Sequence, residues 1–333
     1  METEINFRKR QLAAFSVLSG VLPMNVLADD VDGSASRRPI SLVVGYPPGG
    51  GADTLARLLA AHFAQPLGRD IVVENKPGAA SNIAAEFVSR AAPDGNTLYI
   101  GTRSNTLHKA MYSHFDYDMS RDFVPIGLLA RMPNVIVTSA QGPIASIGDV
   151  ISLAKAHPGM LTYASTGVAS DTHLLGELFQ AESQTKLLHV PYRGGAAAMV
   201  DLVGGRVDLL VFSLAGVLPH LKTGAVRALA VMARQRVPSL PGVPTMEESG
   251  VLGVDMETWL GLLAPAGTSP QLIAKLNDCA NRVLLNRRLQ NAFMAQGYVA
   301  PLQPNTPETF ARLIAEETER WTTLIRERDI KLG

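Results

Sequence analysis

The chain has 333 residues, 47% of them hydrophobic, which is enough for two ordinary domains. Its 30 Lys and Arg residues balance 30 Asp and Glu residues, and no basic block stands out, which argues against a nucleic-acid partner. Cys279 is the only cysteine, so an internal disulfide is excluded.

The first 28 residues have the pattern of a secretory signal peptide. Arg8–Arg10 precede an uncharged apolar run, and the small residues Val26 and Ala28 predict cleavage after Ala28. A buried amphipathic helix is the alternative interpretation of this run. Export from the cytoplasm is therefore predicted, and no later segment is apolar enough to predict a membrane span.

The chain that follows alternates short apolar runs with helical patterns. Strands are predicted at 40–46, 70–75 and 97–102, and helices at 52–68 and 81–92. Gly68 ends the first helix, and the second helix places Ile83, Phe87 and Val88 on one face. This β-α-β-α-β order predicts a parallel, doubly wound α/β sheet flanked by helices.

The βα pattern restarts near residue 133 and changes again in the tail. The second unit has predicted strands at 134–139, 160–166, 186–192, 207–213 and 226–232, with helices between them. A strand-like run at 260–264 is interpreted as a return crossing, followed by three helices. The sequence therefore predicts a discontinuous lobe 1 (38–132 plus 256–333), a lobe 2 (133–255), two crossings, and a cleft for a small ligand.

A glycine-rich turn, GYPPGGGADT at 45–54, separates the first strand from the first helix. Bare backbone N–H groups and a helix N-terminus at a strand end would suit an anion, although a purely structural turn is the alternative. A phosphate-binding P-loop is excluded because Ala52 and Asp53 follow Gly51, and a dinucleotide fingerprint is excluded by Thr54.

Three further strand ends carry the same kind of chemistry, and we expect them to face the first turn across the cleft. Their polar or glycine residues are Thr102, Ser104, Asn105 and Thr106; Ser165, Thr166, Gly167 and Ser170; and Tyr192, Arg193, Gly194 and Gly195.

Catalytic and metal-binding patterns are missing from the sequence. There is no Gly-x-Ser-x-Gly elbow and no His-Glu-x-x-His, and the seven histidines show no metal-ligand spacing. Cys279, Trp259 and Trp321 are interpreted as packing residues, and His173 as a capping or packing residue at a helix start. The sequence predicts a protein that is not an enzyme, with no catalytic residues, cofactor or metal.

Six separated blocks resemble one family. In order they are GYPPGGGADTLARLLA, VENKPGAASNIAAEFVSRAAPDGNTLYIGT, HVPYRGGAAAMVDLVGG with VDLL, PHLKTG with VRALAV, VPTMEESG, and WLGLLAPAGT. They resemble the Bug-type extracytoplasmic solute receptors of tripartite tricarboxylate transporters over nearly all of residues 38–333.

The resemblance implies a type II periplasmic binding protein fold, with two lobes, mostly parallel sheets and two interlobe crossings. It implies a small carboxylate ligand, two membrane subunits of a tripartite permease as partners, and a monomeric receptor. A sensing subunit for a membrane kinase is an alternative role. An exported enzyme acting on a small carboxylate is another, with Asp53, Asp171 or His173 as its candidate base.

The resemblance also implies ligand-binding positions in both lobes. In the first lobe they are Tyr46, Pro47, Pro48, Gly49, Gly50, Gly51, Asp53, Asn82, Thr102, Arg103 and Ser104. In the second lobe they are Ser165, Thr166, Gly167, Ser170, His173, Tyr192, Arg193, Gly194 and Ser213, with Ala215 also near the pocket.

Four residues, at three places in the chain, depart from the family's usual pattern. His108 and Lys109 stand where Asn-Pro is common, and Arg103 replaces a residue that is usually small. Asp171 replaces an uncharged residue, and it would repel an anionic ligand about 4 Å away by about 4 kcal/mol at an effective dielectric constant of 20. That repulsion would be avoided if Asp171 points outward, meets Arg103 or Arg193, or caps the following helix.

Overall fold

The computed structural model of the chain describes residues 38–107, 115–301 and 303–327. All of them lie in one compact unit, Arg37–Gly333. The predicted signal peptide, residues 1–28, and the positions His108 and Lys109 lie outside the described residues. Within the described ranges, no helix is both long enough and apolar enough to cross a membrane.

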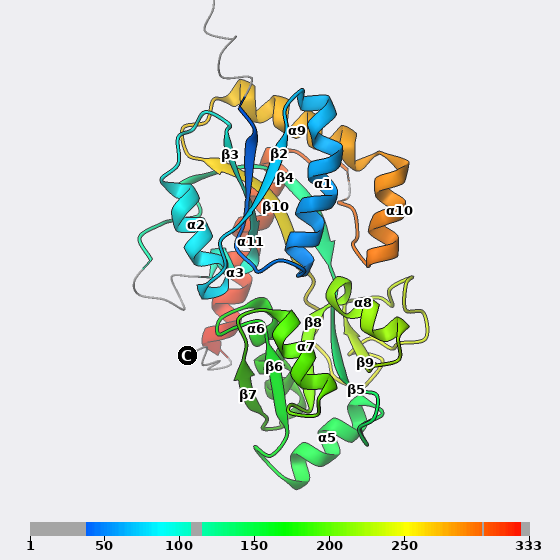
Figure 1. Cartoon of the computed structure of the whole chain (residues 1–333). Helices are drawn as coiled ribbons and strands as arrows, with labels where there is room; N and C mark the ends of the chain where they lie inside the picture. The colour runs from blue at the N-terminus through cyan, green and yellow to red at the C-terminus, as the bar shows by residue number, and fades with distance from the viewer. Residues whose placement is uncertain (1–37, 108–114, 302, 328–333) are drawn as a thin grey trace, which may run out of the picture. The chain divides into compact units, whose positions relative to one another are not determined.

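The first sheet has five strands in the order β2-β1-β3-β10-β4 (Figure 1). Their bounds are β1 Ile40–Val44, β2 Ile71–Asn75, β3 Thr97–Thr102, β4 Phe123–Met132 and β10 Thr258–Pro265. β1 pairs in parallel with β2 and β3, whereas β10 runs antiparallel to both β3 and β4. One strand of five is reversed, and it is the strand predicted at 260–264.

The second sheet repeats this plan with the order β7-β6-β8-β5-β9. Its strands are β5 Asn134–Ser139, β6 Thr162–Ser165, β7 Leu188–Pro191, β8 Leu209–Ser213 and β9 Val226–Met232. Here β5 is the reversed strand. The prediction of two mostly parallel sheets flanked by helices is confirmed, and the lobe boundaries stay a prediction.

Helices follow most strands. Their bounds are α1 Gly51–Leu67, α2 Asn82–Ser89, α3 Arg103–Thr106, α5 Ile147–Ala156, α6 Asp171–Ser183, α7 Gly195–Val203, α8 Leu214–Lys222, α9 Pro270–Leu284, α10 Arg287–Gln296 and α11 Pro307–Glu327. Gly68 ends α1 in the left-handed conformation with φ 63°, as predicted. Each strand-to-helix order brings a helix N-terminus to the carboxyl end of a strand, where a ligand site is expected.

The long strand β4 was not indicated by the sequence patterns. Pro125 and Gly127 interrupt its apolar run, and both residues are depleted in central strands. β4 lies at the edge of the first sheet, where a proline need not supply an N–H group to a further strand.

The predicted packing face of α2 is wrong in part. Val88 is fully buried, but Ile83 and Phe87 are each 47% exposed. The buried face carries Ala84 and Ala85, whose small side chains let the helix lie close to the sheet. Lys76 covers the ring of Phe87, with Nζ 4.0 Å from its centre.

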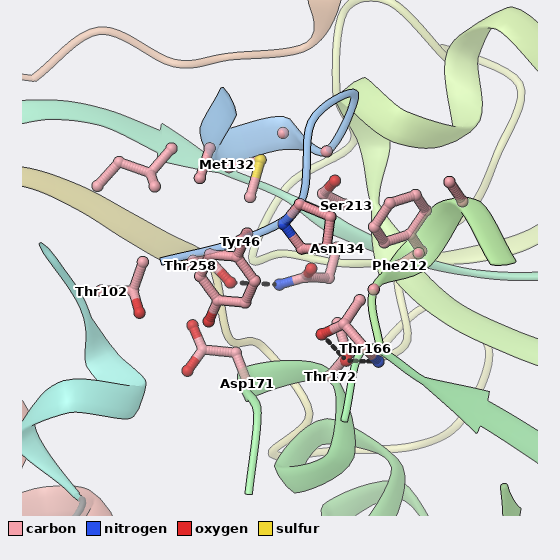
Figure 2. A pocket seen from close by; sticks show the side chains of 18 of the residues that line it. Tyr46, Thr102, Met132, Asn134, Thr166, Asp171, Thr172, Phe212, Ser213 and Thr258 are labelled. Carbon is pink, nitrogen blue, oxygen red and sulfur yellow. Dashed lines mark hydrogen bonds between the residues drawn. The ribbon is translucent and has the colours of Figure 1, made fainter. Parts of the chain in front are cut away.

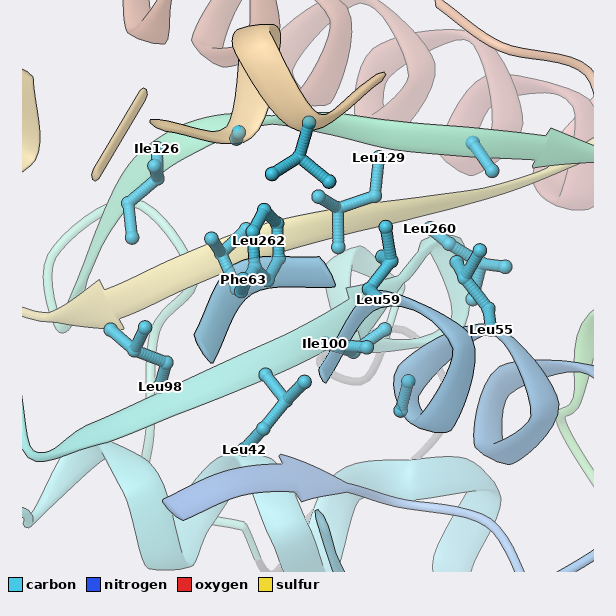
Figure 3. Close-up of a cluster of buried hydrophobic side chains, with 14 of the residues drawn as sticks. Leu42, Leu55, Leu59, Phe63, Leu98, Ile100, Ile126, Leu129, Leu260 and Leu262 are labelled. Atoms are coloured by element: carbon cyan, nitrogen blue, oxygen red, sulfur yellow. The ribbon is translucent and has the colours of Figure 1, made fainter. Parts of the chain in front are cut away.

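The core of the first sheet fixes the position of α1. Leu55, Leu59 and Phe63 recur at helical spacing and pack against strand residues such as Leu42 and Ile100 (Figure 3). Cys279 lies in the same cluster as a free buried thiol, and Trp259 and Trp321 are also buried, so the predicted packing roles are confirmed. This packing holds the N-terminus of α1 at the end of β1.

Candidate functional site

A cavity of about 260 Å³ lies where the loops of the two sheets meet (Figure 2). Strand ends and helix starts from both sheets line it. The lining residues are Tyr46, Pro47, Pro48, Gly50, Gly51, Ala52, Thr102, Met132, Asn134, Thr166, Asp171, Thr172, Arg193, Gly194, Gly195, Ala196, Ala197, Phe212, Ser213, Thr258 and Leu260.

The turn between β1 and α1 forms one wall of this cavity. The Gly49 backbone N–H donates to Asp53 Oδ2 at 2.9 Å, which closes the turn. A Cβ on Gly51 would lie 2.3 Å from Met132 Sδ and 3.0 Å from Ser213 Oγ, so a side chain there would force Met132 to move. The glycines therefore let the backbone approach the second sheet closely.

The start of α7 forms the opposite wall. A Cβ on Gly195 would lie 2.0 Å from Phe212 Cζ, and one on Gly194 would lie 2.9 Å from Pro47 Cγ. Gly194 also has φ 120°, which L side chains rarely adopt. The β1–α1 turn and the α7 turn thus touch each other beside the cavity.

Three helix N-termini at this cavity have no side-chain cap. They belong to α1, α7 and α8, whose N-cap residues are Gly50, Gly194 and Ser213. The first N–H groups of an α-helix have no partner within the helix, and they carry a partial positive charge. All three N-cap residues line the cavity, so it can accept an anion through backbone groups.

The structure brings half of the sequence-predicted site residues to the cavity. Those that line it are Tyr46, Pro47, Pro48, Gly50, Gly51, Thr102, Thr166, Arg193, Gly194 and Ser213. Those that do not are Gly49, Asp53, Asn82, Arg103, Ser104, Ser165, Gly167, Ser170, His173 and Tyr192, and Ala215 is also outside the lining.

A neighbouring cavity accounts for two of this second group. Gly167 and Tyr192 line it, together with Tyr46, Pro47 and Arg193, which border both cavities. The Tyr192 hydroxyl donates to Asp201 Oδ2 at 2.7 Å, which holds the side chain against α7.

Asp53 supports the glycine turn. Its carboxylate accepts hydrogen bonds from the Gly49 N–H, from Arg57 Nε at 3.0 Å and from Asn75 Nδ2 at 2.9 Å. Burial favours a higher pKa for Asp53, but these hydrogen bonds outweigh it and hold the pKa below its ordinary value. An ionised, fully bonded carboxylate is a poor general base.

Asn82, Ser165 and Ser170 are also held by the protein itself. Asn82 Nδ2 donates to the Ala79 carbonyl at 2.6 Å, and its oxygen accepts from the Tyr117 hydroxyl. Ser165 Oγ lies 2.7 Å from His189 Nε2, and Ser170 Oγ caps α6 by accepting from the His173 N–H.

His173 is a packing residue at the start of α6. Its Nδ1 accepts from the Ala169 N–H at 3.0 Å, and its ring stacks on His189 with centres 3.8 Å apart. Burial, aided by the nearby His189, lowers the pKa of His173 to about 3, and burial lowers the pKa of His189 to about 4. Both imidazoles are therefore neutral at pH 7.

We expect His189→Phe to flatten the pH dependence of stability. Between pH 6.5 and about 4 the unfolded state protonates this histidine and the folded state does not. The free energy of unfolding therefore decreases as the pH is lowered through this range. Phenylalanine keeps a stacked ring without a titrating group. The slope of the unfolding free energy should fall by about 1.4 kcal/mol per pH unit.

Urea unfolding at several pH values between about 6 and 4.5 measures this slope. His157→Phe is the control, because it makes the same replacement at an exposed histidine at the end of α5. If the slope in His189→Phe equals that of the wild-type protein, the inference that the stacked His189 ring stays neutral in the folded state is wrong.

Several lining residues were missed by the sequence reasoning. Met132 and Asn134 flank the first crossing, and Thr258 and Leu260 follow the second. Asn134 Nδ2 donates to Thr258 Oγ1 at 3.0 Å, which joins the two crossings. A polar residue at the start of an otherwise apolar strand was the available signal. Among the described side chains, no group of three or more His, Cys, Asp or Glu residues is placed to hold a metal ion.

Two α/β sheets joined by two crossings around a shared cavity define a solute-binding receptor. The chain belongs to the tripartite tricarboxylate transporter receptor family: the family model described as "Tripartite tricarboxylate transporter family receptor" matches residues 55–330. This family of solute-binding receptors implies a periplasmic location and a role in tripartite transport.

Two curated relatives cover nearly the whole chain. A protein encoded in the tcbD–tcbE intergenic region of Pseudomonas sp. (strain P51) is 35% identical over 96% of this chain and 94% of its own length. BugT of Bordetella pertussis is 35% identical over 89% of this chain and 90% of its own.

Solved structures agree with this assignment. A structure described as a periplasmic transporter has a TM-score of 0.86 and 34% identity, covering 90% of this chain and 100% of that one. The structure of Rpa4515 of R. palustris with adipate has a TM-score of 0.84 and 32% identity, and the match covers 88% of this chain and 98% of that one. The structure of MatC from Rhodopseudomonas palustris with bound malate has a TM-score of 0.81 and 33% identity, and the match covers 86% of this chain and 99% of that one.

Proposed function

We propose that the chain binds a small carboxylate in the cavity between its two sheets and delivers it to the two membrane subunits of a tripartite permease. The observation that carries this proposal is the meeting of three uncapped helix N-termini at one cavity. Hydrogen bonds from such groups to a desolvated carboxylate are charge-assisted and strong. The solved relatives with adipate and malate support the same ligand class.

The proposed receptor acts without changing its ligand. Of the three candidate bases, Asp53 is saturated with hydrogen bonds and His173 is buried in a stacked pair, and neither lines the cavity. Asp171 does line it and is interpreted below as a recognition group. We further propose export by a signal peptide cleaved after Ala28 and action as a monomer.

A thermal-shift screen of the mature protein tests this function. The screen contains small carboxylates, amino acids and aromatic acids, with the matching neutral amides as controls. A ligand at 100 times its dissociation constant should stabilise the protein by about 2.7 kcal/mol, and its amide should give no shift. If no acid raises the melting temperature, the proposed function is wrong; if the recovered ligand is chemically changed, the enzyme alternative replaces it.

A further inference from the structure

We propose that Asp171 and Asn134 select carboxylates that carry a hydrogen-bond donor, an ammonium or a hydroxyl, on the carbon chain. The inference rests on the proposed function and adds a substrate class to it. Both residues line the cavity: Asp171 is the first residue of α6, and Asn134 is the first residue of β5, directly after the first crossing (Figure 2).

Asp171 offers a buried acceptor atom to the ligand. The residue is 5% exposed, and its Oδ1 accepts from Ser104 Oγ at 3.1 Å. Its Oδ2 has no hydrogen-bond partner among the described residues. Arg103 Nη1, which also has no hydrogen-bond partner within the described ranges, lies 3.7 Å from Oδ2, a distance that allows an ion pair but is too long for a hydrogen bond.

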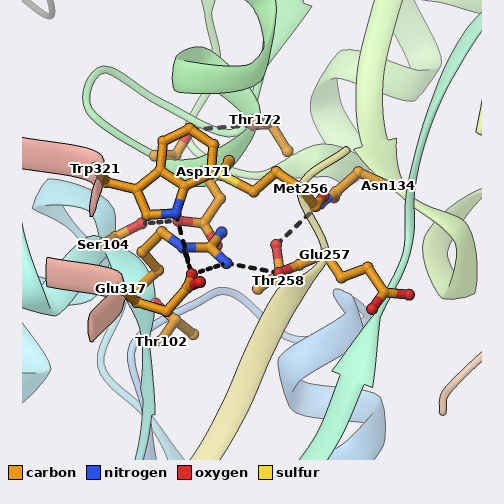
Figure 4. A network of polar contacts seen from close by, with 12 residues as sticks. Thr102, Ser104, Asn134, Asp171, Thr172, Met256, Glu257, Thr258, Glu317 and Trp321 are labelled. Carbon is orange, nitrogen blue, oxygen red and sulfur yellow. Dashed lines mark hydrogen bonds and ion pairs between the residues drawn. The ribbon is translucent and has the colours of Figure 1, made fainter. Parts of the chain in front are cut away.

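One cation, Arg103, is shared between two carboxylates, those of Glu317 and Asp171, both labelled in Figure 4, and none of its hydrogen bonds goes to Asp171. Its Nε and Nη2 donate to Glu317 Oε2 at 2.7 and 2.6 Å, and Nη2 also donates to the Glu257 carbonyl at 2.8 Å. Ionised Arg103, Glu317 and Asp171 together carry a net charge of −1. A cationic or donor group of the ligand would compensate this buried charge.

Asn134 adds a second acceptor. The residue is 1% exposed, and its Nδ2 faces Thr258 Oγ1 at 3.0 Å and the Met256 carbonyl at 3.5 Å. A carbonyl can only accept, so the amide nitrogen belongs on that side and the oxygen is turned the other way. Asn134 Oδ1 has no hydrogen-bond partner within the described part of the chain.

Asp171 Oδ2 and Asn134 Oδ1, two buried acceptors without a hydrogen-bond donor from any described residue, would favour ligands that supply donors over ligands that do not. A ligand that supplies donors satisfies both atoms, whereas an unsubstituted acid leaves them desolvated and unpaired. Sites built to hydrogen-bond a substrate group reject analogues that lack it. The ligand carboxylate would meet the helix N-termini, and its ammonium or hydroxyl would meet Asp171 and Asn134.

Calorimetry with matched acids tests the inference. The probes are succinate, malate and aspartate, and the five-carbon series glutarate, 2-hydroxyglutarate and glutamate, which differ within a series only in –H, –OH or –NH₃⁺. At the chain length that binds, we expect a donor-bearing acid to bind at least tenfold tighter than the unsubstituted acid. The order of the ammonium and hydroxyl acids identifies which donor the site takes.

Asp171→Asn should reduce this preference to less than about threefold, because the charge that rewards the donor is lost. Asp278→Asn removes a charge from an exposed position on α9 and should leave the preference unchanged. Equal or tighter binding of the unsubstituted acid to the wild-type protein would overturn the inference and leave the proposed function standing. Binding of no acid in the screen or in either series would overturn the proposed function itself.

Discussion

Replacement of Arg103 by methionine is expected to lower the free energy of unfolding by about 3–5 kcal/mol. Removal of one partner from a buried ion pair leaves an uncompensated charge, and that charge is costly where water is excluded. Here two carboxylates would lose their cation, because Glu317 and Asp171 both lie beside the guanidinium with side chains 16% and 6% exposed.

The geometry explains why so much depends on one side chain. Glu317 Oε2 accepts from Arg103 and also from Trp321 Nε1 at 3.0 Å, and the guanidinium lies 5.2 Å from the centre of the Trp321 ring. Arg103 therefore ties the end of β3 to α11, and through Glu257 it reaches the chain just before β10. Methionine keeps an apolar stem of similar length but none of these bonds.

Arg320→Met is the matched control. Arg320 also lies over the Trp321 ring, 5.1 Å from its centre, but its side chain is 44% exposed and its partner Asp255 is 3.6 Å away. A surface pair of this kind contributes about 0–1 kcal/mol. Urea unfolding of both variants measures the difference. Similar losses in the two variants would show that the ring contact, rather than the buried ion pair, matters.

Gly50→Val is expected to weaken carboxylate binding at least 100-fold, about 2.7 kcal/mol, while the protein stays folded. Gly50 has φ −80° and ψ 168°, an extended conformation that valine adopts readily. A Cβ there meets only the Pro47 carbonyl oxygen, at an ordinary 3.6 Å. The valine methyls would instead enter the cavity and cover the backbone N–H groups at the start of α1.

Position 50 is a cleaner test than position 51. A side chain on Gly51 would collide with Met132 and Ser213, so a loss of binding there would not be separable from a change in packing. Gly242→Val is the control for added bulk, because that glycine is exposed and a Cβ there meets no atom within 4 Å. Calorimetry with the best acid of the screen decides, and wild-type affinity in Gly50→Val would refute the binding role of this turn.

The strands and helices followed from local patterns wherever those patterns were uninterrupted. The β-branched run of β1 and the 3–4 spacing of Leu55, Leu59 and Phe63 in α1 predict those elements without any tertiary information. β4 was not predicted, because Pro125 and Gly127 interrupt its apolar run. Whether a strand tolerates a proline depends on its place in the sheet, and that place is set by a partner about 135 residues later, β10.

Some residues of the candidate site were predicted from the sequence, and others were identified only from the tertiary structure. The glycine turn at 45–54 and the small residues before α7 were recognisable because backbone exposure is a local property of glycine. Arg103, which the resemblance implies as a ligand-binding residue, lies outside the lining of the cavity and pairs with Glu317, 214 residues away. For Asn134 and Thr258 the local signal was only a polar residue at the start of an apolar strand, and the hydrogen bond between them forms only where the two crossings lie side by side.

The sequence by itself thus determined the α/β class, the family resemblance and the glycine-rich turns, since these depend on residue type and short spacing. Only the tertiary structure decided which polar groups are satisfied and which are left facing the cavity. How far Arg103 offsets the charge of Asp171 depends on the distance from Asp171 Oδ2 to Arg103, 3.7 Å, and on the shorter ion pair that Arg103 makes with Glu317. Such distances join segments far apart along the chain, and packing of the whole unit sets them.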